Sequence, residues 1–247
     1  MQAIILAAGM GIRLRPFTDD IPKALVPVRG VPLIQRMLSV LAQEDIEEII
    51  VVIGYQGEKI RQAIGSEYKG IPITYAENPL YASTNNVYSL FLAQHYITED
   101  AVLLECDLLI SGETIHALVQ SQADCNILVS PYDGETMDGT IVLLDKDGAV
   151  RELVVKKMQG EDFDYTSAYK TVNIYKFKKE FLKDKFFPAL SLYVRTQGRD
   201  IYYELILGSL IYFHNSDITI TKISPSLWCE IDGPDDLKRA EAKAIMK

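Results

Sequence analysis

Two glycines followed by basic side chains form the part of the sequence best suited to phosphate chemistry. Gly9 and Gly11 come directly after an apolar N-terminal run, and Arg13 and Lys23 follow them. Residues without Cβ let the backbone N–H groups close around an anion, and the two cations add positive charge, which suits a nucleoside triphosphate. The loop does not match the Walker A pattern G-x-x-x-x-G-K-[ST]. It also does not match the dinucleotide-binding fingerprint, because that pattern would need a third glycine at Leu14. A plain glycine turn with two surface cations is the simpler alternative.

The segment around this loop resembles the signature of a known enzyme family. It reads A-A-G-M-G-I-R-L-R-P-F-T-D-D-I-P-K-A-L and resembles the loop of nucleotidyltransferases that activate sugar phosphates and small phospho-alcohols. The resemblance implies that Arg13 holds the triphosphate and that Lys23 contacts the phosphates of both substrates. It also implies a nucleotide-binding loop formed by Leu6, Ala7, Ala8, Gly9, Met10 and Gly11. Ala24 and the length of 247 residues favour the small cytidylyltransferases over the longer sugar-specific members.

Two acidic residues are candidates to hold a metal ion. Nucleotidyl transfer needs charge neutralisation at the α-phosphate, normally from Mg²⁺ bound by one or two carboxylates. Asp107 follows an apolar strand in a segment resembling the family's acid-x-acid motif, and Asp232 lies in a segment resembling its second metal motif. The resemblance implies Mg²⁺ on Asp107 and Asp232, with Arg13, Lys23 and Asp107 as the catalytic residues. The alternatives are a strand-end turn for Asp107 and a helix cap for Asp232, while Glu105 receives no definite role.

A polar segment between a strand and a helix is the candidate site for the base. The pattern N-x-x-Y-x-x-x-N-N-x-Y-S-L begins at Asn78 and resembles the corresponding region of bacterial-type phosphocholine cytidylyltransferases, which favours CTP as the nucleotide. Amide and hydroxyl groups at this place could read a pyrimidine edge. The expected nucleotide-binding residues here are Asn78, Tyr81, Ser83, Thr84, Asn85 and Asn86. The alternative is that Asn85 and Asn86 only cap the helix.

Two later segments resemble the acceptor pocket of cytidylyltransferases that act on phosphocholine or 2-aminoethylphosphonate. The residues that this resemblance assigns to the acceptor are Lys170, Asn173, Tyr202, Tyr203 and Glu204. Core packing is the alternative for each of the two tyrosines. The tryptophan expected in a choline cage has no match around Met137, which favours the phosphonate. A primary ammonium could instead use carboxylates, for which Glu204, Asp200 and Asp138 are candidates.

Together these features predict the transfer of CMP from CTP to a small phospho- or phosphono-amino-alcohol, with release of pyrophosphate. The acceptor is expected to be 2-aminoethylphosphonate or phosphocholine. The alternatives are a nucleotidyltransferase for sugar 1-phosphates or inositol phosphates, and a nucleotide-binding regulator without catalysis. The oligomeric state is not readable from the chain.

The pattern of apolar residues predicts an α/β chain of Rossmann-like architecture. Apolar runs and amphipathic stretches alternate up to about residue 110, which is typical of βα units in a mainly parallel, mixed sheet flanked by helices. From about residue 125 to 177, β-branched runs separated by turns predict a small antiparallel extension, with a substrate-covering loop at 156–169. Helices are expected at 178–192, 200–212 and from 234 to the C-terminus. We expect residues 1–247 to form a single domain.

The net charge and the cysteine content limit the kinds of partner and site that we expect for this chain. The chain has 48% hydrophobic and 24% charged residues and a net charge of −9, so its overall field attracts neither nucleic acid nor an anionic membrane. Its three cysteines form no closely spaced pair, which disfavours a disulfide framework or a structural zinc site. No signal peptide or membrane-spanning run is visible. The expected compartment is the cytoplasm, and the expected partners are small-molecule substrates.

Overall fold

The computed structural model of the chain describes residues 1–214 and 217–243. Its principal helices are α1 (Leu33–Leu41), α2 (Gly57–Ile64), α3 (Asn86–Ala93), α4 (Gly112–Val119), α5 (Lys179–Phe181), α6 (Phe187–Thr196), α7 (Glu204–His214) and α8 (Pro234–Ala242). Its strands are β1 (Gln2–Ala7), β2 (Pro27–Val28), β3 (Val31–Pro32), β4 (Glu48–Ile53), β5 (Glu67–Tyr68), β6 (Ile71–Glu77), β7 (Ala101–Glu105), β8 (Leu108–Ile110), β9 (Cys125–Pro131), β10 (Ile141–Leu144), β11 (Val150–Val154), β12 (Tyr169–Phe177), β13 (Ile218–Lys222) and β14 (Trp228–Glu230).

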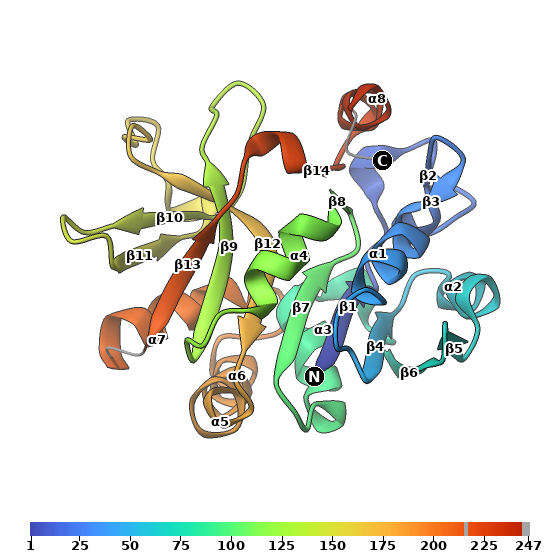
Figure 1. The fold of residues 1–247 in the computed structure, drawn as a ribbon, viewed down its shortest axis with the longest axis horizontal. Coiled ribbons are helices and arrows are strands. Elements are labelled where there is room, and N and C mark those ends of the chain that lie inside the picture. The colour runs from blue at the N-terminus through green and yellow to red at the C-terminus, as the bar shows by residue number, and fades with distance from the viewer. Residues whose placement is uncertain (215–216, 244–247) are drawn as a thin grey trace.

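One mixed sheet runs through the molecule (Figure 1). Strands β7, β1, β4 and β6 lie side by side and parallel, as the alternating pattern predicts. The sheet then continues through β12, which pairs antiparallel with β7. Strands β9 and β10 both pair with β12, and β11 completes a hairpin with β10. The expected class, a Rossmann-like mixed sheet with an antiparallel extension, is confirmed.

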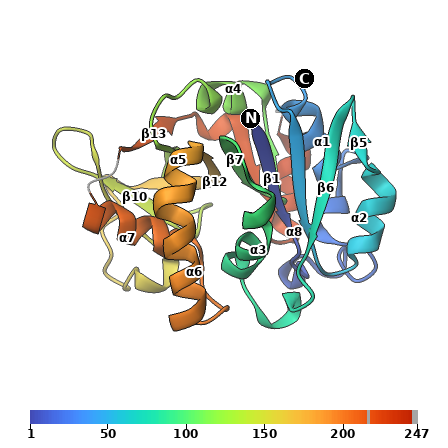
Figure 2. The same ribbon diagram turned by 90° about the horizontal axis from the view of Figure 1, so that it is seen from below.

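Helices cover both faces of the sheet. Side chains alternate across β1, so that Ile4 packs in one core and Ile5 in the other. The first core contains apolar residues of α3, α6 and α7, and the second contains those of α1, α2 and α4. Figure 2 shows α4 on one side of β7 and β1, with α3 and α6 on the other. Because both faces are covered, β1, β4 and β7 are apolar along most of their length, which explains why they are visible in the sequence.

Several details differ from the expectations. Strands β8 and β14 and helix α4 lie where no element was expected, and β13 joins the extension parallel to β9. The helix expected at 178–192 is interrupted by a π-helical turn at Leu182–Phe186 and continues to Thr196. The end of the helix expected from Pro234 lies partly outside the described residues. Among the helices that the structure describes, none has the length and apolar character to cross a membrane.

The loop at 156–169 begins with a short 3₁₀ turn and is packed against the extension. The Tyr165 ring stacks on Tyr132 with 4.5 Å between centroids, and Gln159 Nε2 donates to the carbonyl of Gly139 at 2.8 Å. Residues 156–169 line neither of the two cavities described below. A covering role for this loop stays a prediction.

Candidate active site

A cavity of about 390 Å³ lies where the parallel strands β1, β6 and β7 end. Parallel strands present their carboxyl ends at one edge of a sheet, and ligands bind there in folds of this kind. The backbone holds the segments together: Cys106 N donates to Leu6 O at 3.2 Å, and Asn78 N donates to Ile53 O at 2.8 Å. The edge therefore gathers the glycine loop, the acidic segment after β7 and the polar segment after β6.

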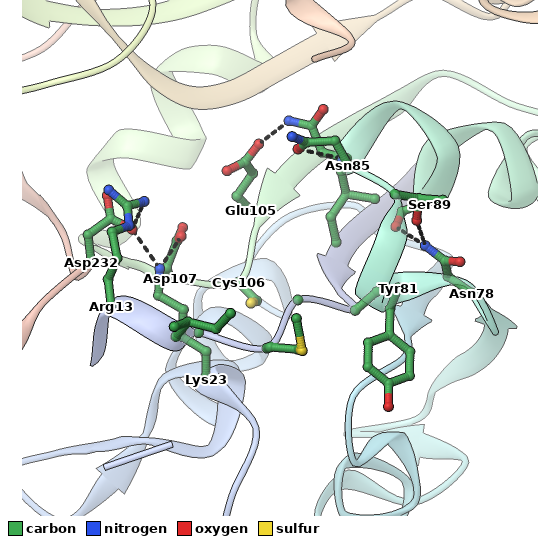
Figure 3. Close-up of a pocket in the computed structure, with 18 of the residues that line it drawn as sticks. Arg13, Lys23, Asn78, Tyr81, Asn85, Ser89, Glu105, Cys106, Asp107 and Asp232 are labelled. Atoms are coloured by element: carbon green, nitrogen blue, oxygen red, sulfur yellow. Dashed lines mark hydrogen bonds and ion pairs between the residues drawn. The ribbon is translucent and has the colours of Figure 1, made fainter. Parts of the chain in front are cut away.

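Most of the residues expected to bind the nucleotide line this cavity. Those that do are Leu6, Ala8, Gly9, Met10, Gly11, Arg13, Lys23, Asn78, Tyr81, Thr84, Asn85 and Asn86. Ala7 and Ser83 do not line it. In Figure 3, Arg13, Lys23, Asp107 and Asp232 lie at one end of the cavity, and Asn78, Tyr81, Asn85 and Ser89 lie at the other, with Glu105 between them. A cationic and acidic end thus faces an amide-rich end across one space.

The two glycines of the loop differ in the space that surrounds them. Gly11 has a φ of +61°, and a Cβ there would lie 3.1 Å from both Lys23 Cβ and Thr18 Cγ2, so the turn requires glycine. Thr18 Oγ1 also donates to Gly11 O at 2.7 Å, which fixes the turn. A Cβ on Gly9 would have no atom within 4 Å. A side chain at Gly9 would thus begin in open space.

Lys23 joins two carboxylates from distant parts of the chain. Its Nζ lies 2.7 Å from Asp107 Oδ2 and 2.8 Å from Asp232 Oδ1, and Arg13 Nη2 lies 2.8 Å from the same Asp232 oxygen. Burial works to lower the pKa of Lys23, but the charges of Asp107 and Asp232 outweigh it and raise the pKa well above its usual range. Burial likewise opposes ionisation of Asp232, yet Lys23 and Arg13 hold its pKa below the usual value. Lys23 and Asp232 are therefore both charged at neutral pH.

A third carboxylate completes a group that fits a hard cation. Asp107, Glu230 and Asp232 each offer an oxygen, and these oxygens lie within 4.8 Å of one another. Asp107 Oδ1 is buried and has no hydrogen-bond partner within the described residues, so this oxygen is available to bind a cation. Carboxylate oxygens are the ligands that Mg²⁺ prefers. The residues present fit magnesium. Glu230 was not expected in this role, although it lies two positions before Asp232, a spacing that keeps side chains on one face of an extended segment.

The amide groups at the other end are largely engaged with the protein. Asn78 Nδ2 donates to Thr84 Oγ1 and Ser89 Oγ at 3.0 and 3.1 Å. Asn85 Oδ1 accepts from Asn86 N at 2.8 Å, so the expected alternative of a helix cap holds for Asn85. A cap formed through Oδ1 still leaves the Asn85 amide nitrogen as a donor. Capping and base contact are thus compatible at this residue.

Only one of the residues expected to bind the acceptor lines the cavity. Tyr202 does so with 42% of the residue exposed, whereas Tyr203 is fully buried with its ring centroid 5.5 Å from that of Tyr175. Lys170 is buried and forms an ion pair with Glu230 at 3.3 Å. Asn173, with a φ of +57°, donates to Glu230 Oε1 at 3.0 Å. The structure thus places Lys170 and Asn173 behind Glu230 rather than on the cavity wall, and their contact with an acceptor stays a prediction.

A second cavity of about 280 Å³ adjoins the first. It shares Arg13 and Asp232 with the first cavity, and its other lining residues include Met137, Asp138 and Trp228. Asp138 forms an ion pair with Lys156 at 2.8 Å, so the protein already supplies a cation for it. The position where a cage tryptophan was expected is thus occupied by an apolar and a paired acidic side chain.

Similar proteins point to one family. A CMP-5'-(3-aminopropyl)phosphonate synthase from Streptomyces rubellomurinus is 31% identical over 241 residues, which are 98% of this chain and 38% of that protein. A UTP–glucose-1-phosphate uridylyltransferase from Haloferax volcanii is 34% identical, covering 63% of this chain and 65% of that protein. A choline-phosphate cytidylyltransferase from Streptococcus pneumoniae is 41% identical over 42% of this chain and 43% of that protein. The chain covers less than two thirds of the length of each.

Solved structures share the fold. The CTP:phosphocholine cytidylyltransferase from Streptococcus pneumoniae aligns with a TM-score of 0.75 and 21% identity, covering 98% of this chain and 97% of that one. The inositol-1-phosphate CTP transferase from T. maritima aligns with a TM-score of 0.75 and 22% identity, covering 99% and 95%. The profile of the nucleotidyl transferase family matches residues 2–202. With that match over most of its length, the chain belongs to the nucleotidyl transferase family.

Proposed function

We propose that the chain transfers CMP from CTP to a small phosphono- or phospho-amino-alcohol and releases pyrophosphate. The observation that carries the proposal is the pair of ion pairs from Lys23 to Asp107 and Asp232, set at one end of a cavity whose wall begins with the glycine loop. Lys23 and Arg13 supply cations for a phosphate chain that gains negative charge during the reaction, and a divalent cation on the carboxylates would offset the negative charge of those groups. The names of two relatives, a CMP-aminopropylphosphonate synthase and a choline-phosphate cytidylyltransferase, support a cytidylyl donor and an amine-bearing acceptor.

The residues would act by position and charge. An acceptor phosphoryl oxygen attacks the α-phosphorus of CTP in line, a new P–O bond forms, and the bond from the α-phosphorus to the bridging oxygen breaks so that pyrophosphate leaves. Lys23 stabilises the charge that grows at the α-phosphate, and Arg13 holds the leaving pyrophosphate. Magnesium held by Asp107, Glu230 and Asp232 would neutralise phosphate charge there. No covalent intermediate with the protein is required.

Among acceptors we favour 2-aminoethylphosphonate over phosphocholine. The second cavity has Met137 where a cage tryptophan was expected. Trp228 also lines it, but this residue is only 3% exposed and has Lys170 Nζ 6.0 Å from its ring centroid, so it offers little open aromatic face to a quaternary ammonium. A primary ammonium needs hydrogen-bond acceptors instead, and Glu105, Asp107 and Asp232 line the first cavity. The uridylyltransferase relative keeps a sugar 1-phosphate as the second candidate acceptor.

Pyrophosphate release tests this proposal. The four ribonucleoside triphosphates are each combined with 2-aminoethylphosphonate, phosphocholine, phosphoethanolamine and glucose 1-phosphate, in the presence of Mg²⁺. We expect release with CTP and the amine-bearing acceptors. Release with UTP and glucose 1-phosphate would replace the proposal by the sugar-phosphate alternative. Nucleotide binding without release from any pair would favour a regulator.

A further inference from the structure

Asn173 has an unusual backbone conformation for a residue inside a strand. Its φ is +57°, in the left-handed region that residues other than glycine rarely adopt, and it lies in the middle of β12. The other described non-glycine residues with a positive φ, Arg29, Gln56 and Lys69, all lie in turns. A conformation of this kind inside a buried strand costs free energy, so it points to a demand on where the side chain is placed.

The same stretch of β12 is a bulge. The pairing of β12 with β9 advances by four residues on β12, from Thr171 to Tyr175, and by only two residues on β9. The bulge lies between the part of β12 that pairs with β10 and the part that pairs with β7. In a regular strand, residues three positions apart point to opposite faces, but a bulge changes the direction in which a side chain points. Lys170 and Asn173 are therefore able to reach one partner.

That partner is the carboxylate of Glu230, and each of its oxygens is held by one of the two residues. Asn173 Nδ2 donates to Glu230 Oε1 at 3.0 Å, and Lys170 Nζ lies 3.3 Å from Glu230 Oε2. Asn173 is only 7% exposed and Lys170 only 1%. A carboxylate can only accept, so the amide nitrogen of Asn173 must face it, and Thr171 Oγ1 donates to the amide oxygen at 2.9 Å. A single strand thus fixes both oxygens of Glu230.

This support differs from that of the other two acids in the group. Asp107 and Asp232 are both bound by Lys23, whereas Glu230 is held by side chains of β12. An ionised carboxylate has about four lone-pair positions, so Glu230 keeps lone pairs for a cation beyond these two contacts. Asn173 is neutral, so it fixes one oxygen without cancelling the charge that attracts a metal ion, as a second lysine would.

We propose that Asn173, placed by the bulge in β12, is a positioning residue that orients Glu230 toward a divalent cation shared with Asp107 and Asp232. The inference rests on the proposed function, in which these three acids hold magnesium. It assigns Asn173 a role through Glu230 in place of the direct contact with the acceptor that the sequence predicted. Loss of a residue that orients a metal ligand typically weakens metal binding by about 10- to 100-fold.

Mn²⁺ binding to the protein without substrates tests the inference. Mn²⁺ prefers the same oxygen ligands as Mg²⁺, and free Mn²⁺ is measured by electron paramagnetic resonance at pH 8, above the pKa of Glu230 of about 7. Asn173→Gly removes the amide and lets the backbone keep its positive φ. Asn126→Ala is the matched control, because Asn126 is a buried asparagine of the neighbouring strand β9 whose amide donates to Thr219 Oγ1 at 2.8 Å.

We expect Asn173→Gly to raise the dissociation constant for Mn²⁺ by about 10- to 100-fold. Asn126→Ala should change it by less than about threefold, even where both variants lower the melting temperature. In a Glu230→Gln background, Asn173→Gly should add less than about threefold, because the carboxylate that it orients is already gone. At saturating Mg²⁺, the KM for the acceptor should stay within about threefold in Asn173→Gly.

An unchanged Mn²⁺ affinity in Asn173→Gly would overturn the inference, and so would an unaltered protein that binds no Mn²⁺. Equal losses in Asn173→Gly and Asn126→Ala would reduce Asn173 to a structural role. A loss that is just as large in the Glu230→Gln background would show that Asn173 does not act through Glu230. A higher KM for the acceptor with unchanged Mn²⁺ affinity would return Asn173 to the acceptor site. CTP-dependent turnover upholds cytidylyl transfer in each of these cases, so the two claims fail separately.

Discussion

Lys23, Asp107 and Asp232 come from three separate segments and meet only through folding. The lysine forms an ion pair with each carboxylate in the free protein, and its side chain is only 11% exposed. Its charge is therefore already fixed in place before a substrate binds. A cation that does not have to reorganise is most effective where charge develops in a transition state.

Lys23→Ala should lower kcat by at least about 100-fold while weakening CTP binding much less. Steady-state kinetics and a direct titration with CTP separate the two effects. Arg15→Ala is the control, since Arg15 pairs with Asp19 on the exposed side of the loop and does not line the cavity. A Lys23→Ala enzyme with near-normal kcat would remove this lysine from the mechanism.

Asp107→Asn and Asp232→Asn should each raise the Mg²⁺ concentration needed for half-maximal rate, because an amide keeps the shape but loses the charge that holds a hard cation. If both acids hold one ion, the double variant is little worse than either single variant. A metal titration of the three variants measures this. Strictly additive losses would mean that the acids do not share an ion.

The elements that the sequence predicted well are those buried on both faces. β1 and β7 are continuous apolar runs, and α3 has a polar capping residue at its start, so local patterns are enough to place them. β8 and β14 were missed because each is three residues long and their pairing, Leu108 with Glu230, joins distant parts of the chain. No local signal reports such a pairing.

The same limit applies to the site. Motifs identified the glycine loop, Lys23 and the two aspartates, all of which the structure brings to one cavity edge. Two adjacent tyrosines carry no sign of which one is buried, and the structure turns Tyr203 into the core and Tyr202 to the cavity. The buried pair of Lys170 with Glu230 depends on strands that are far apart in sequence. Motif resemblance therefore identifies the residues at the edge of the cavity, but not the buried residues that pack behind them.

Gly54, directly after β4, lies in close contact with two segments that line the cavity. A Cβ there would lie 2.7 Å from Ala8 O and 2.8 Å from Tyr81 Cβ. Gly54→Ala should therefore destabilise the fold by about 1–3 kcal/mol and raise the KM for CTP, since Ala8 and Tyr81 line the cavity. Gly160→Ala is the control, because its Cβ would have no atom within 4 Å. Equal melting temperatures for the two variants in thermal unfolding would contradict this account.

At the scale of the whole molecule, the ionised form of Glu230 lowers the stability of the fold at neutral pH. Burial is the main reason that the pKa of Glu230 is raised to about 7. The positive charge of Lys170 opposes this rise, and repulsion from Asp107 and Asp232 adds to it. A carboxyl with a raised pKa binds more protons folded than unfolded, so its contribution to stability falls as the pH rises from about 4.5 to 7. Ionised Glu230 thus carries an electrostatic cost that a bound cation would relieve.

Glu230→Gln removes this titration. Without metal, the melting temperature of the variant relative to that of the unchanged protein should rise by about 5–10 °C between pH 5 and pH 8. The comparison across pH cancels any constant loss from leaving Lys170 without its partner. Thermal unfolding in a chelator at the two pH values measures the difference. A difference that does not change with pH would contradict the raised pKa.

The most direct test of the central claim is a competition in one tube. The protein receives CTP, Mg²⁺ and equal amounts of 2-aminoethylphosphonate, phosphocholine and glucose 1-phosphate, and the cytidylylated products are counted by mass spectrometry. We predict that the two amine-bearing products together exceed CDP-glucose by about 100-fold or more, with the phosphonate product ahead of the choline product. CDP-glucose as the main product would contradict the acceptor assignment, and the absence of every CMP-linked product would contradict cytidylyl transfer itself.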